Sequence, residues 1–229
     1  MIAAVILGAG KGSRLTGAPL PKQFMNLRQS PMIVETVEKF AFVEAIDRIV
    51  VVVSSPWMSH AKDLFEKKSY FKKMLFCQGG ETRQRSLLNA CYFLEREFGR
   101  DVCVVSHDAA RPFVSLRIIE DNIKKLGEKK SCDTILSCTD TIVESVDGKE
   151  ISNIPNRNLL YQGQTPQSFL SHDYIEAFEK IGEDSSVTDA AKLLLRYGKA
   201  VSIVEGEPFN IKITTDFDLA FANFLMSSK

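Results

Sequence analysis

The stretch Ile2–Arg14, with the sequence IAAVILGAGKGSR, decides the fold class. Its first six residues form a continuous apolar run that ends at a glycine, which is typical of a strand buried on both faces of a parallel sheet. The glycines at positions 8, 10 and 12 let backbone N–H groups approach a phosphate closely. The spacing is not that of a Walker loop. It also misses the dinucleotide-binding fingerprint, because Ser13 stands in place of its third glycine. The stretch predicts a buried strand followed by a phosphate-binding loop.

Apolar runs alternate with amphipathic segments along most of the chain. Further strands are predicted near 46–53, 74–77 and 101–106, and helices near 31–40, 57–68, 83–98 and 116–126. The pattern returns late in the chain, with helices near 172–181 and 188–197, strands at 200–204 and 211–214, and a closing helix from Asp216. Strands that alternate with helices of this length pair in parallel through right-handed crossovers. We therefore expect an α/β, Rossmann-like, doubly wound and mostly parallel sheet.

The alternation breaks after about residue 132. Residues 134–146 look extended, Asp147-Gly148 is a strong hairpin turn signal, and residues 150–154 are able to return as a second strand. We expect a single domain over 1–229 with a protruding β-hairpin arm at about 137–160. A two-stranded ribbon is marginally stable alone, so the arm is expected to pack on a second copy and form a homodimer.

Composition excludes several classes of protein. The 229 residues include 29 Lys plus Arg and 29 Asp plus Glu, without the basic excess of a nucleic-acid binder. No run of 18 apolar residues is present, so no membrane insertion is expected, and the N-terminus lacks the basic start of a signal peptide. The five cysteines form no C-x-x-C pair and suit a reducing compartment. These features predict a cytoplasmic protein that binds no nucleic acid.

Two further charged clusters follow predicted strands. Residues 79–86 read GGETRQRS and open a predicted helix, where Arg83 and Arg85 oppose the helix dipole unless an anion is bound. Residues 106–113 read SHDAARPF and follow the strand at 101–106. The carboxyl ends of the strands of an open parallel sheet meet at one edge, where ligands bind. Both clusters are therefore expected beside the first glycine loop.

Cations and one carboxylate specify the chemistry expected there. Arg14 and Lys22 follow the first loop, and N–H donors with an arginine and a lysine make a strong triphosphate site. A single carboxylate among such cations, here Asp108, usually holds Mg²⁺ rather than acting as a base. The alternative for Asp108 is a structural bridge to Arg111. His107 is expected to be a packed, hydrogen-bonded neighbour and not a catalyst.

The motifs together resemble those of the sugar-alcohol-phosphate cytidylyltransferases. The segments that carry the resemblance are 7–14, 21–23, 79–86, 107–112, 165–167 and 210–214. One branch of that family makes CDP-methylerythritol from 2-C-methyl-D-erythritol 4-phosphate, and the other makes CDP-ribitol from ribitol 5-phosphate. Residues 154–157 and 160–169 are more similar to the ribitol branch, since Asn156 stands where the other branch usually has aspartate.

The resemblance implies transfer of the cytidylyl group of CTP to D-ribitol 5-phosphate, with CDP-ribitol and pyrophosphate as products and Mg²⁺ or another divalent cation as cofactor. It also implies a place in teichoic acid or capsule polysaccharide synthesis. Transfer to 2-C-methyl-D-erythritol 4-phosphate is the alternative.

The resemblance further implies the role of each site residue. Arg14 and Lys22 are the expected catalytic residues. The expected CTP-binding residues come from the three clusters and are Leu7, Gly8, Ala9, Gly10, Gly80, Glu81, Thr82, Arg83, Ser86, Asp108, Ala109 and Arg111. The polyol phosphate is expected to bind Arg157, Thr165 and Lys212, and the metal is expected to bind Asp108. Two choices stay open: Thr139 or Thr141 as the residue that reaches a partner's substrate, and Glu207 or Asp189 as the second metal ligand.

Other classes of protein fit the residues less well. A nicotinamide-dependent oxidoreductase needs an acidic residue after the second strand, which here ends in Ser54-Ser55-Pro56. A glycosyltransferase usually carries an Asp-x-Asp motif; Asp216–Asp218 has that spelling, but it opens the last helix and reads better as an N-cap. A non-catalytic nucleotide-binding protein would bind nucleotide without releasing pyrophosphate.

Overall fold

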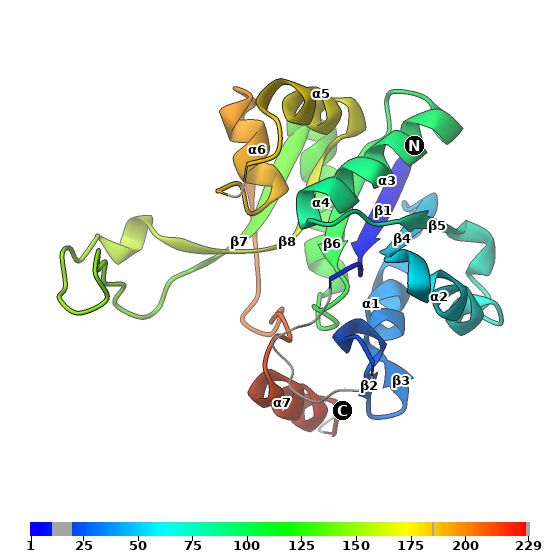
Figure 1. Ribbon diagram of the computed structural model, residues 1–229, viewed down its shortest axis with the longest axis horizontal. Coiled ribbons are helices and arrows are strands. Elements are labelled where there is room, and N and C mark those ends of the chain that lie inside the picture. The colour runs from blue at the N-terminus through cyan, green and yellow to red at the C-terminus, as the bar shows by residue number, and fades with distance from the viewer. Residues whose placement is uncertain (11–19, 185, 228–229) are drawn as a thin grey trace.

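The central feature of the computed structural model, which describes residues 1–10, 20–184 and 186–227, is a seven-stranded sheet (Figure 1). The strand order is β5-β4-β1-β6-β8-β7-β9. In chain order these strands are β1 (Ile2–Leu7), β4 (Arg48–Val53), β5 (Met74–Gln78), β6 (Cys103–Asp108), β7 (Ser131–Ser137), β8 (Tyr161–Leu170) and β9 (Ser202–Glu205). The strands β5, β4, β1 and β6 are mutually parallel, whereas β8 is antiparallel to β6 and β7. The predicted mostly parallel, Rossmann-like sheet is confirmed.

Helices cover both faces of the sheet because successive residues of each buried strand point to opposite sides. Ala3 and Val5 of β1 pack toward α3 (Arg83–Phe98), α5 (Ser171–Ile181) and α6 (Ala190–Arg196). Ala4 and Ile6 pack toward α1 (Met32–Ala41), α2 (Met58–Phe65) and α4 (Leu116–Lys129). Since both faces are apolar, β1 reads as an uninterrupted hydrophobic run rather than as an alternating one.

The structure differs from the expected elements at two places late in the chain. Residues 211–214 were expected to form a strand and do not. They form a loop that is tied to the residues after β6 by one backbone hydrogen bond, from Ile213 N to Ala110 O at 2.8 Å. The long strand β8 was not expected, and its Gly163 and Pro166 both disfavour a strand interior. Pairing with β6 and β7 overrides that preference, and the ladder with β7 shifts register between Asp133 and Ile135, opposite the proline.

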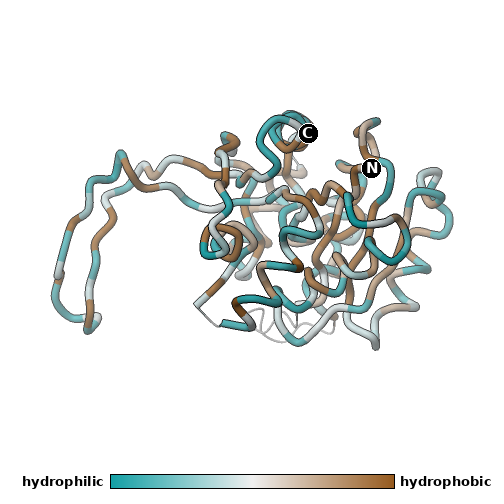
Figure 2. The backbone as a smooth tube through the Cα atoms, turned by 90° about the horizontal axis from the view of Figure 1, so that it is seen from above, coloured by the Kyte–Doolittle hydropathy of each residue, from teal (hydrophilic) through white to brown (hydrophobic). Residues whose placement is uncertain are grey.

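Residues 138–160 leave the sheet between β7 and β8 as the protruding arm seen in Figures 1 and 2. The expected hairpin ladder is reduced to a single bridge between Glu144 and Asn153, followed by the 3-10 helix η4 (Arg157–Leu159). The turn forms as predicted: Gly148 has φ +71°, and Asp147 Oδ1 accepts from Lys149 N at 2.9 Å. A ribbon with no second face to pack on retains little of its ladder.

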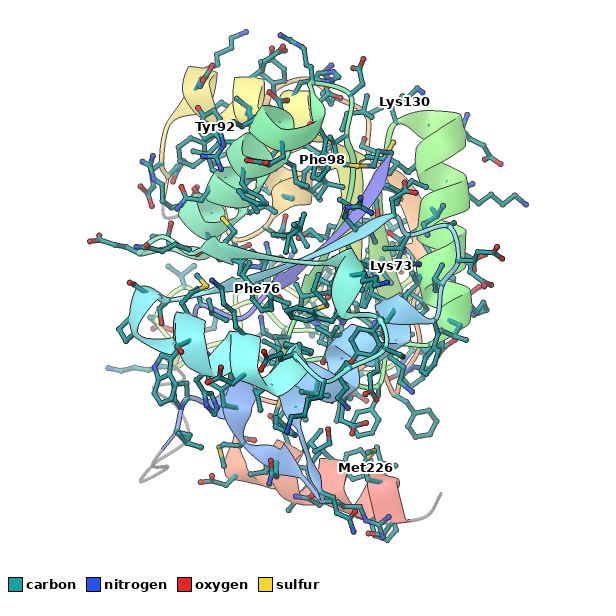
Figure 3. All side chains as sticks on the ribbon, turned by 90° about the vertical axis from the view of Figure 1, so that its right-hand side faces the viewer. Lys73, Phe76, Tyr92, Phe98, Lys130 and Met226 are labelled. Carbon is teal, nitrogen blue, oxygen red and sulfur yellow. The ribbon has the colours of Figure 1, made fainter. Side chains whose placement is uncertain are left out.

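The last helix, α7 (Asp216–Ser227), lies beside the short hairpin β2 (Asn26–Leu27) and β3 (Ser30–Pro31), as Figure 3 shows near Met226. Arg28 N donates to Asn223 Oδ1 at 3.0 Å and Arg28 Nη1 to Met226 O at 2.7 Å. The remaining short helices are η1 (Lys22–Phe24), η2 (Ser55–Trp57) and η3 (Phe71–Lys73). Within the described residues, no helix is both long and apolar enough to cross a bilayer.

Candidate functional site

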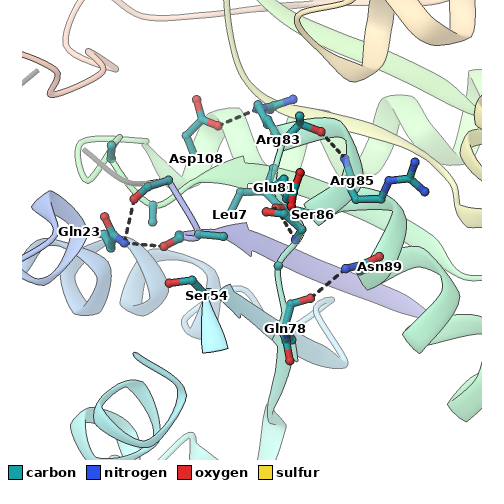
Figure 4. Close-up of a pocket in the computed structure, with 18 of the residues that line it drawn as sticks. Leu7, Gln23, Ser54, Gln78, Glu81, Arg83, Arg85, Ser86, Asn89 and Asp108 are labelled. Carbon is teal, nitrogen blue, oxygen red and sulfur yellow. Dashed lines mark hydrogen bonds and ion pairs between the residues drawn. The ribbon is translucent and has the colours of Figure 1, made fainter. Parts of the chain in front are cut away.

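A cleft of about 1420 Å³ opens at the carboxyl edge of the sheet (Figure 4). The register of the sheet places Leu7 beside Val52 on one side and Asp108 on the other, so the loops after β1, β4 and β6 converge. The cleft is lined by Leu7, Gly8, Ala9, Gly10, Lys22, Gln23, Ser54, Ser55, Pro56, Gln78, Gly79, Gly80, Glu81, Thr82, Arg83, Arg85, Ser86, Asn89, Asp108, Ala109, Ala110, Glu183, Lys212 and Thr214. The three clusters predicted from the sequence therefore meet at one site.

The two glycine-rich loops touch each other in the floor of this cleft. A Cβ at Gly79 would overlap the Ala9 side chain and lie 3.0 Å from Ser86 Oγ, so only glycine fits there. Gln23 supports the first loop from below, and its Nε2 donates to Gly8 O at 2.6 Å and to Gly10 O at 3.3 Å (Figure 4). These contacts bring backbone groups of both loops to the cleft surface, where they are able to bind a nucleotide.

Three cations surround the carboxylate of Asp108, which is only 6% exposed. Lys212 Nζ lies 2.8 Å from Oδ2, Arg83 Nε donates to Oδ1 at 3.2 Å, and Arg111 Nε lies 3.7 Å from Oδ2. Burial alone would raise the pKa of Asp108, but Arg83, Lys212 and Arg111 outweigh it and hold that pKa well below its usual range. Asp108 is therefore an ionised carboxylate at neutral pH. The expected bridge to Arg111 exists as one of its three ion pairs.

Arg83 is held from behind by a polar chain. Gln167 Oε1 accepts from Arg83 Nη2 at 3.4 Å and from Ala190 N at 3.2 Å, and Gln167 Nε2 donates to Asp133 Oδ1 at 3.1 Å. Burial raises the pKa of Asp133 to about 7. The amide of Gln167 on β8 thus connects Arg83, in the cleft lining, to Asp133 on the neighbouring strand β7.

His107 lies behind the cleft and not in it. The ring is fully buried, its Nε2 lies 3.0 Å from Arg111 O, and its Nδ1 lies 2.8 Å from Thr165 Oγ1. Burial lowers the pKa of His107 to about 4. These contacts are those of a packed, hydrogen-bonded neighbour, as the sequence predicted. Thr165, which was expected to bind the polyol phosphate, is 3% exposed and is absent from the cleft lining.

The structure separates other predicted site residues from the cleft. Arg157 lies in the arm, where its Nη1 donates to Thr139 O at 3.0 Å, and it does not line the cleft that holds Lys212. Arg111 lies behind Asp108 and donates through Nη1 to Asn210 O at 2.8 Å. Arg14 falls outside the described residues.

The donor set at the cleft fits a shared Mg²⁺ ion and not a metal held by the protein alone. Neither candidate for a second ligand lines the cleft: Glu207 Oε1 accepts from Ser115 Oγ at 2.9 Å and pairs with Arg117, and Asp189 Oδ1 accepts from Lys192 N at 2.8 Å. Among the described residues no group of three or more His, Cys, Asp or Glu could hold a metal. Mg²⁺ often binds through one carboxylate with phosphate and water as its other ligands, and Asp108 would be that carboxylate.

Several lining residues were missed by sequence reasoning. Ser54–Pro56 and Gln78 directly follow β4 and β5, so the strand-end rule that selected Asp108 applies to them as well. Asn89 donates from α3 to Gln78 O at 3.2 Å. Glu183 accepts from Thr82 Oγ1 at 2.6 Å and comes from the loop after α5, a position that no local pattern indicates.

Open α/β sheets that bind nucleotides gather them at this edge, and the fold and cleft place the protein in that class. Comparison with known proteins narrows the class. The family model of IspD, described as 2-C-methyl-D-erythritol 4-phosphate cytidylyltransferase, matches residues 2–228. The chain belongs to this cytidylyltransferase family, whose members are nucleotidyltransferase enzymes.

Named relatives include both branches. A ribitol-5-phosphate cytidylyltransferase of Lactiplantibacillus plantarum is 38% identical over 233 residues, which cover all of both chains. Two solved structures are each 28% identical. The 4-diphosphocytidyl-2C-methyl-D-erythritol synthase of Anaerococcus prevotii has a TM-score of 0.85 and covers 99% of this chain and 96% of its own. The 2-C-methyl-D-erythritol 4-phosphate cytidylyltransferase of Francisella tularensis has a TM-score of 0.80 and covers 97% and 98%.

Proposed function

We propose that the protein transfers the cytidylyl group of CTP to D-ribitol 5-phosphate and releases CDP-ribitol and pyrophosphate. The observation that carries the proposal is the cleft in which two glycine-rich loops meet Lys22, and in which Arg83 and Lys212 pair with Asp108. The choice of acceptor is supported by the 38% identity to a relative named for ribitol 5-phosphate over the full length of both chains, and by Asn156 in the arm.

The reaction needs electrostatic help more than it needs a general base. The second pKa of a phosphate monoester is about 6, so the attacking oxygen of ribitol 5-phosphate is already largely ionised at pH 7. That oxygen forms a bond to the α-phosphorus of CTP while the bond from the α-phosphorus to the bridging oxygen breaks, and this oxygen leaves with pyrophosphate. The obstacle is repulsion between two polyanions, together with the charge that builds on the transferring group.

The chain's own residues divide this work. The loops at Gly8–Gly10 and Gly80–Ser86 bind CTP through backbone N–H groups and short side chains. Lys22 lies beside the loop that carries Lys212, since its Nζ donates to Ile213 O at 3.0 Å. Both lysines are thereby positioned to offset charge on the phosphates. Arg14 has the same role by family position.

A divalent cation is the proposed cofactor. Asp108 would hold Mg²⁺ together with phosphate oxygens of the nucleotide, and the bound ion would neutralise charge on those phosphates. Lys212 and Arg83, which pair with Asp108 in this structure, would then have the substrate phosphates as alternative partners.

The proposed assembly is a homodimer formed through the arm. Val146 and Ile151 are 94% and 62% exposed, and an arm with such residues gains by packing on a second copy. In that assembly Arg157 serves the cleft of the partner, since its own chain leaves it outside the cleft lining.

The free cysteines, three of them buried, suit a reducing cytoplasm. Use of the product in teichoic acid or capsule polysaccharide synthesis stays a prediction.

Pyrophosphate release tests the proposal. The protein is incubated with CTP and Mg²⁺ and either ribitol 5-phosphate or 2-C-methyl-D-erythritol 4-phosphate, in parallel. Faster release with ribitol 5-phosphate that stops when EDTA is added is the expected result. Preference for the methylerythritol substrate would support the second candidate, which the family model and both structural relatives favour by name. Nucleotide binding without release from either acceptor would leave only a binding protein.

A further inference from the structure

Behind the cleft, a chain of hydrogen bonds through His107 and Thr165 joins the two ends of the turn Asp108–Arg111. Asp108 N donates to Thr165 Oγ1 at 3.3 Å, Thr165 Oγ1 lies 2.8 Å from His107 Nδ1, and His107 Nε2 lies 3.0 Å from Arg111 O. The turn itself is closed by Arg111 N, which donates to Asp108 O at 3.0 Å. Both ends of the turn that carries Asp108 are thus fixed to β8 by one side-chain pair.

The chemistry of one partner assigns the proton on Nε2 of His107. A carbonyl oxygen only accepts, so Nε2 carries the proton that bonds Arg111 O. The ring is fully buried, lies against Phe40 with the ring centroids 5.0 Å apart and the planes tilted by 49°, and has the Thr165 hydroxyl at Nδ1. Both ring nitrogens therefore have hydrogen-bond partners inside the protein.

The same contacts place the Thr165 hydroxyl inside the protein. It accepts from Asp108 N and bonds His107 Nδ1, so both of its partners belong to β6. Thr165 is 3% exposed and does not line the cleft in which a polyol phosphate would bind. The side chain therefore acts on the reaction through Asp108 and not by direct contact.

We propose that His107 and Thr165 are positioning residues, which hold Asp108 and Arg111 in place through the bonds from Asp108 N to Thr165 Oγ1 and from His107 Nε2 to Arg111 O. The effect on catalysis rests on the proposed function, but the hydrogen-bonded chain does not. The turn also bonds the loop that carries Lys212, because Ile213 N donates to Ala110 O at 2.8 Å. A shift of the turn would therefore displace both partners of the ion pair between Asp108 and Lys212.

The first test is the proton on Nε2 of His107 in the unmodified protein. Long-range ¹⁵N–¹H correlation spectra of uniformly labelled protein at pH 7 should show a protonated Nε2 for this ring. Assignment comes from the loss of these signals in His107→Gln. A ring without a proton on Nε2 would overturn the proposal whatever the substrate proves to be.

The second test is a double-mutant cycle on kcat. Thr165→Val removes the shared hydroxyl, whereas His107→Gln keeps a donor for Arg111 O and loses the ring nitrogen that bonds Thr165. Each single variant should lower kcat by roughly 10–100-fold, because small displacements of catalytic groups have effects of that size, and Thr165→Ser should retain most of the activity. Since both variants break the same bond, the double variant should be no more than about threefold slower than the slower single variant.

The matched control is Thr134→Val. Thr134, on β7, is fully buried, and its hydroxyl donates to Pro166 O on β8, the strand that carries Thr165. The Thr134 side chain does not reach the turn. The variant should change kcat by less than about threefold, as expected for a site with no shared partner.

If Thr165 were a direct substrate contact, Thr165→Val would raise KM for the polyol phosphate alone, and its effect would multiply with that of His107→Gln. That pattern would refute the positioning role. Inactivity of the unmodified enzyme with both polyol phosphates would instead count against the proposed function, while the proton on Nε2 would still be measured.

Discussion

The ammonium nitrogen of Lys212 lies 2.8 Å from Oδ2 of Asp108, although Asp108 ends the central strand β6 and Lys212 comes from a loop just before the last helix. The carboxylate is nearly buried, and Arg83 occupies its other oxygen. The pair therefore fixes the Lys212 loop across the cleft before any substrate binds. An incoming triphosphate, with its several negative charges, would compete with Asp108 for the same two cations.

Asp108→Asn tests the role of this carboxylate in stability. The substitution leaves three cations around a neutral amide, so we expect the free energy of unfolding at pH 7 to fall by roughly 3 kcal/mol. Because the pKa of Asp108 is held below its usual range in the folded protein, its contribution is present above the unfolded pKa of 3.8 and is lost as pH falls below that value. Urea titrations should therefore show a difference from the unmodified protein that shrinks below about pH 4. Asp101→Asn, at an exposed carboxylate, is the control; an equal loss there would contradict the prediction.

Asp133→Asn should have the opposite pH dependence. Burial raises the pKa of Asp133 to about 7, so the folded protein favours the neutral acid, and ionisation weakens folding as pH rises from about 4 toward 7. The amide of the variant is still able to accept from Gln167 Nε2. We expect the variant to gain stability relative to the unmodified protein between pH 5 and pH 8, measured by urea unfolding at each pH. Parallel stability curves would show that Asp133 does not titrate in this range.

The fold was predictable wherever local pattern and tertiary context agree. The helix expected over 83–98 matches α3 residue for residue, because its apolar positions face one sheet and Thr82 caps its start. The strand β8 was not predictable, since its glycine and proline oppose a strand and pairing with two neighbours overrides them. The strand predicted at 211–214 was wrong for the opposite reason. These residues alternate between apolar and polar as a strand does, but they pair with no neighbouring strand.

The candidate site was predictable as far as it lies at strand ends. Asp108 and the two glycine loops meet because parallel strands end at one edge, which the sequence order alone implies. Glu183 and Gln23 depend on side chains that reach across from other elements, and no spacing encodes that reach. Thr165 shows a further limit, because its hydroxyl lies against a histidine on the neighbouring strand, a contact that the local sequence does not encode.

Lys22→Ala tests the catalytic role of Lys22. Loss of one preorganised donor that stabilises charge in the transition state is expected to lower kcat by roughly 10²-fold. Circular dichroism should be unchanged, because Lys22 is the first residue of the short helix η1, a position that alanine is also able to occupy. Lys62→Ala, on α2 and outside the cleft lining, is the matched control and should keep full activity. A fall of less than threefold in kcat for Lys22→Ala would mean that this lysine carries no catalytic charge.

Substitutions in the arm test the homodimer. Val146→Asp and Ile151→Asp place a charge on exposed apolar positions and should weaken self-association, because burying a carboxylate at an interface is costly. Sedimentation velocity at micromolar concentration should give a dimer for the unmodified protein and a shift toward monomer for both variants. Phe42→Asp, at an apolar residue that is 73% exposed and lies outside the arm, should leave the dimer intact. A monomeric mass for the unmodified protein would contradict the proposal that the arm forms a homodimer.

Arg157 decides whether the dimer shares its active sites. Arg157→Ala should raise KM for the polyol phosphate more than KM for CTP, and Arg157→Lys should not be silent, because a guanidinium grips phosphate through two donors. If the arm crosses to the partner, a heterodimer of Lys22→Ala and Arg157→Ala chains has one cleft with both lesions and one intact cleft. At a polyol phosphate concentration well below the KM of Arg157→Ala, where each variant alone is nearly inactive, mixing the two should then restore roughly a quarter of the full activity in a twofold-symmetric dimer. Lys22 and Lys212 line the same cleft of one chain, so mixing Lys22→Ala with Lys212→Ala should restore nothing and serves as the control. Absence of recovery in the first mixture, with heterodimers verified by native mass spectrometry, would place Arg157 in the site of its own chain.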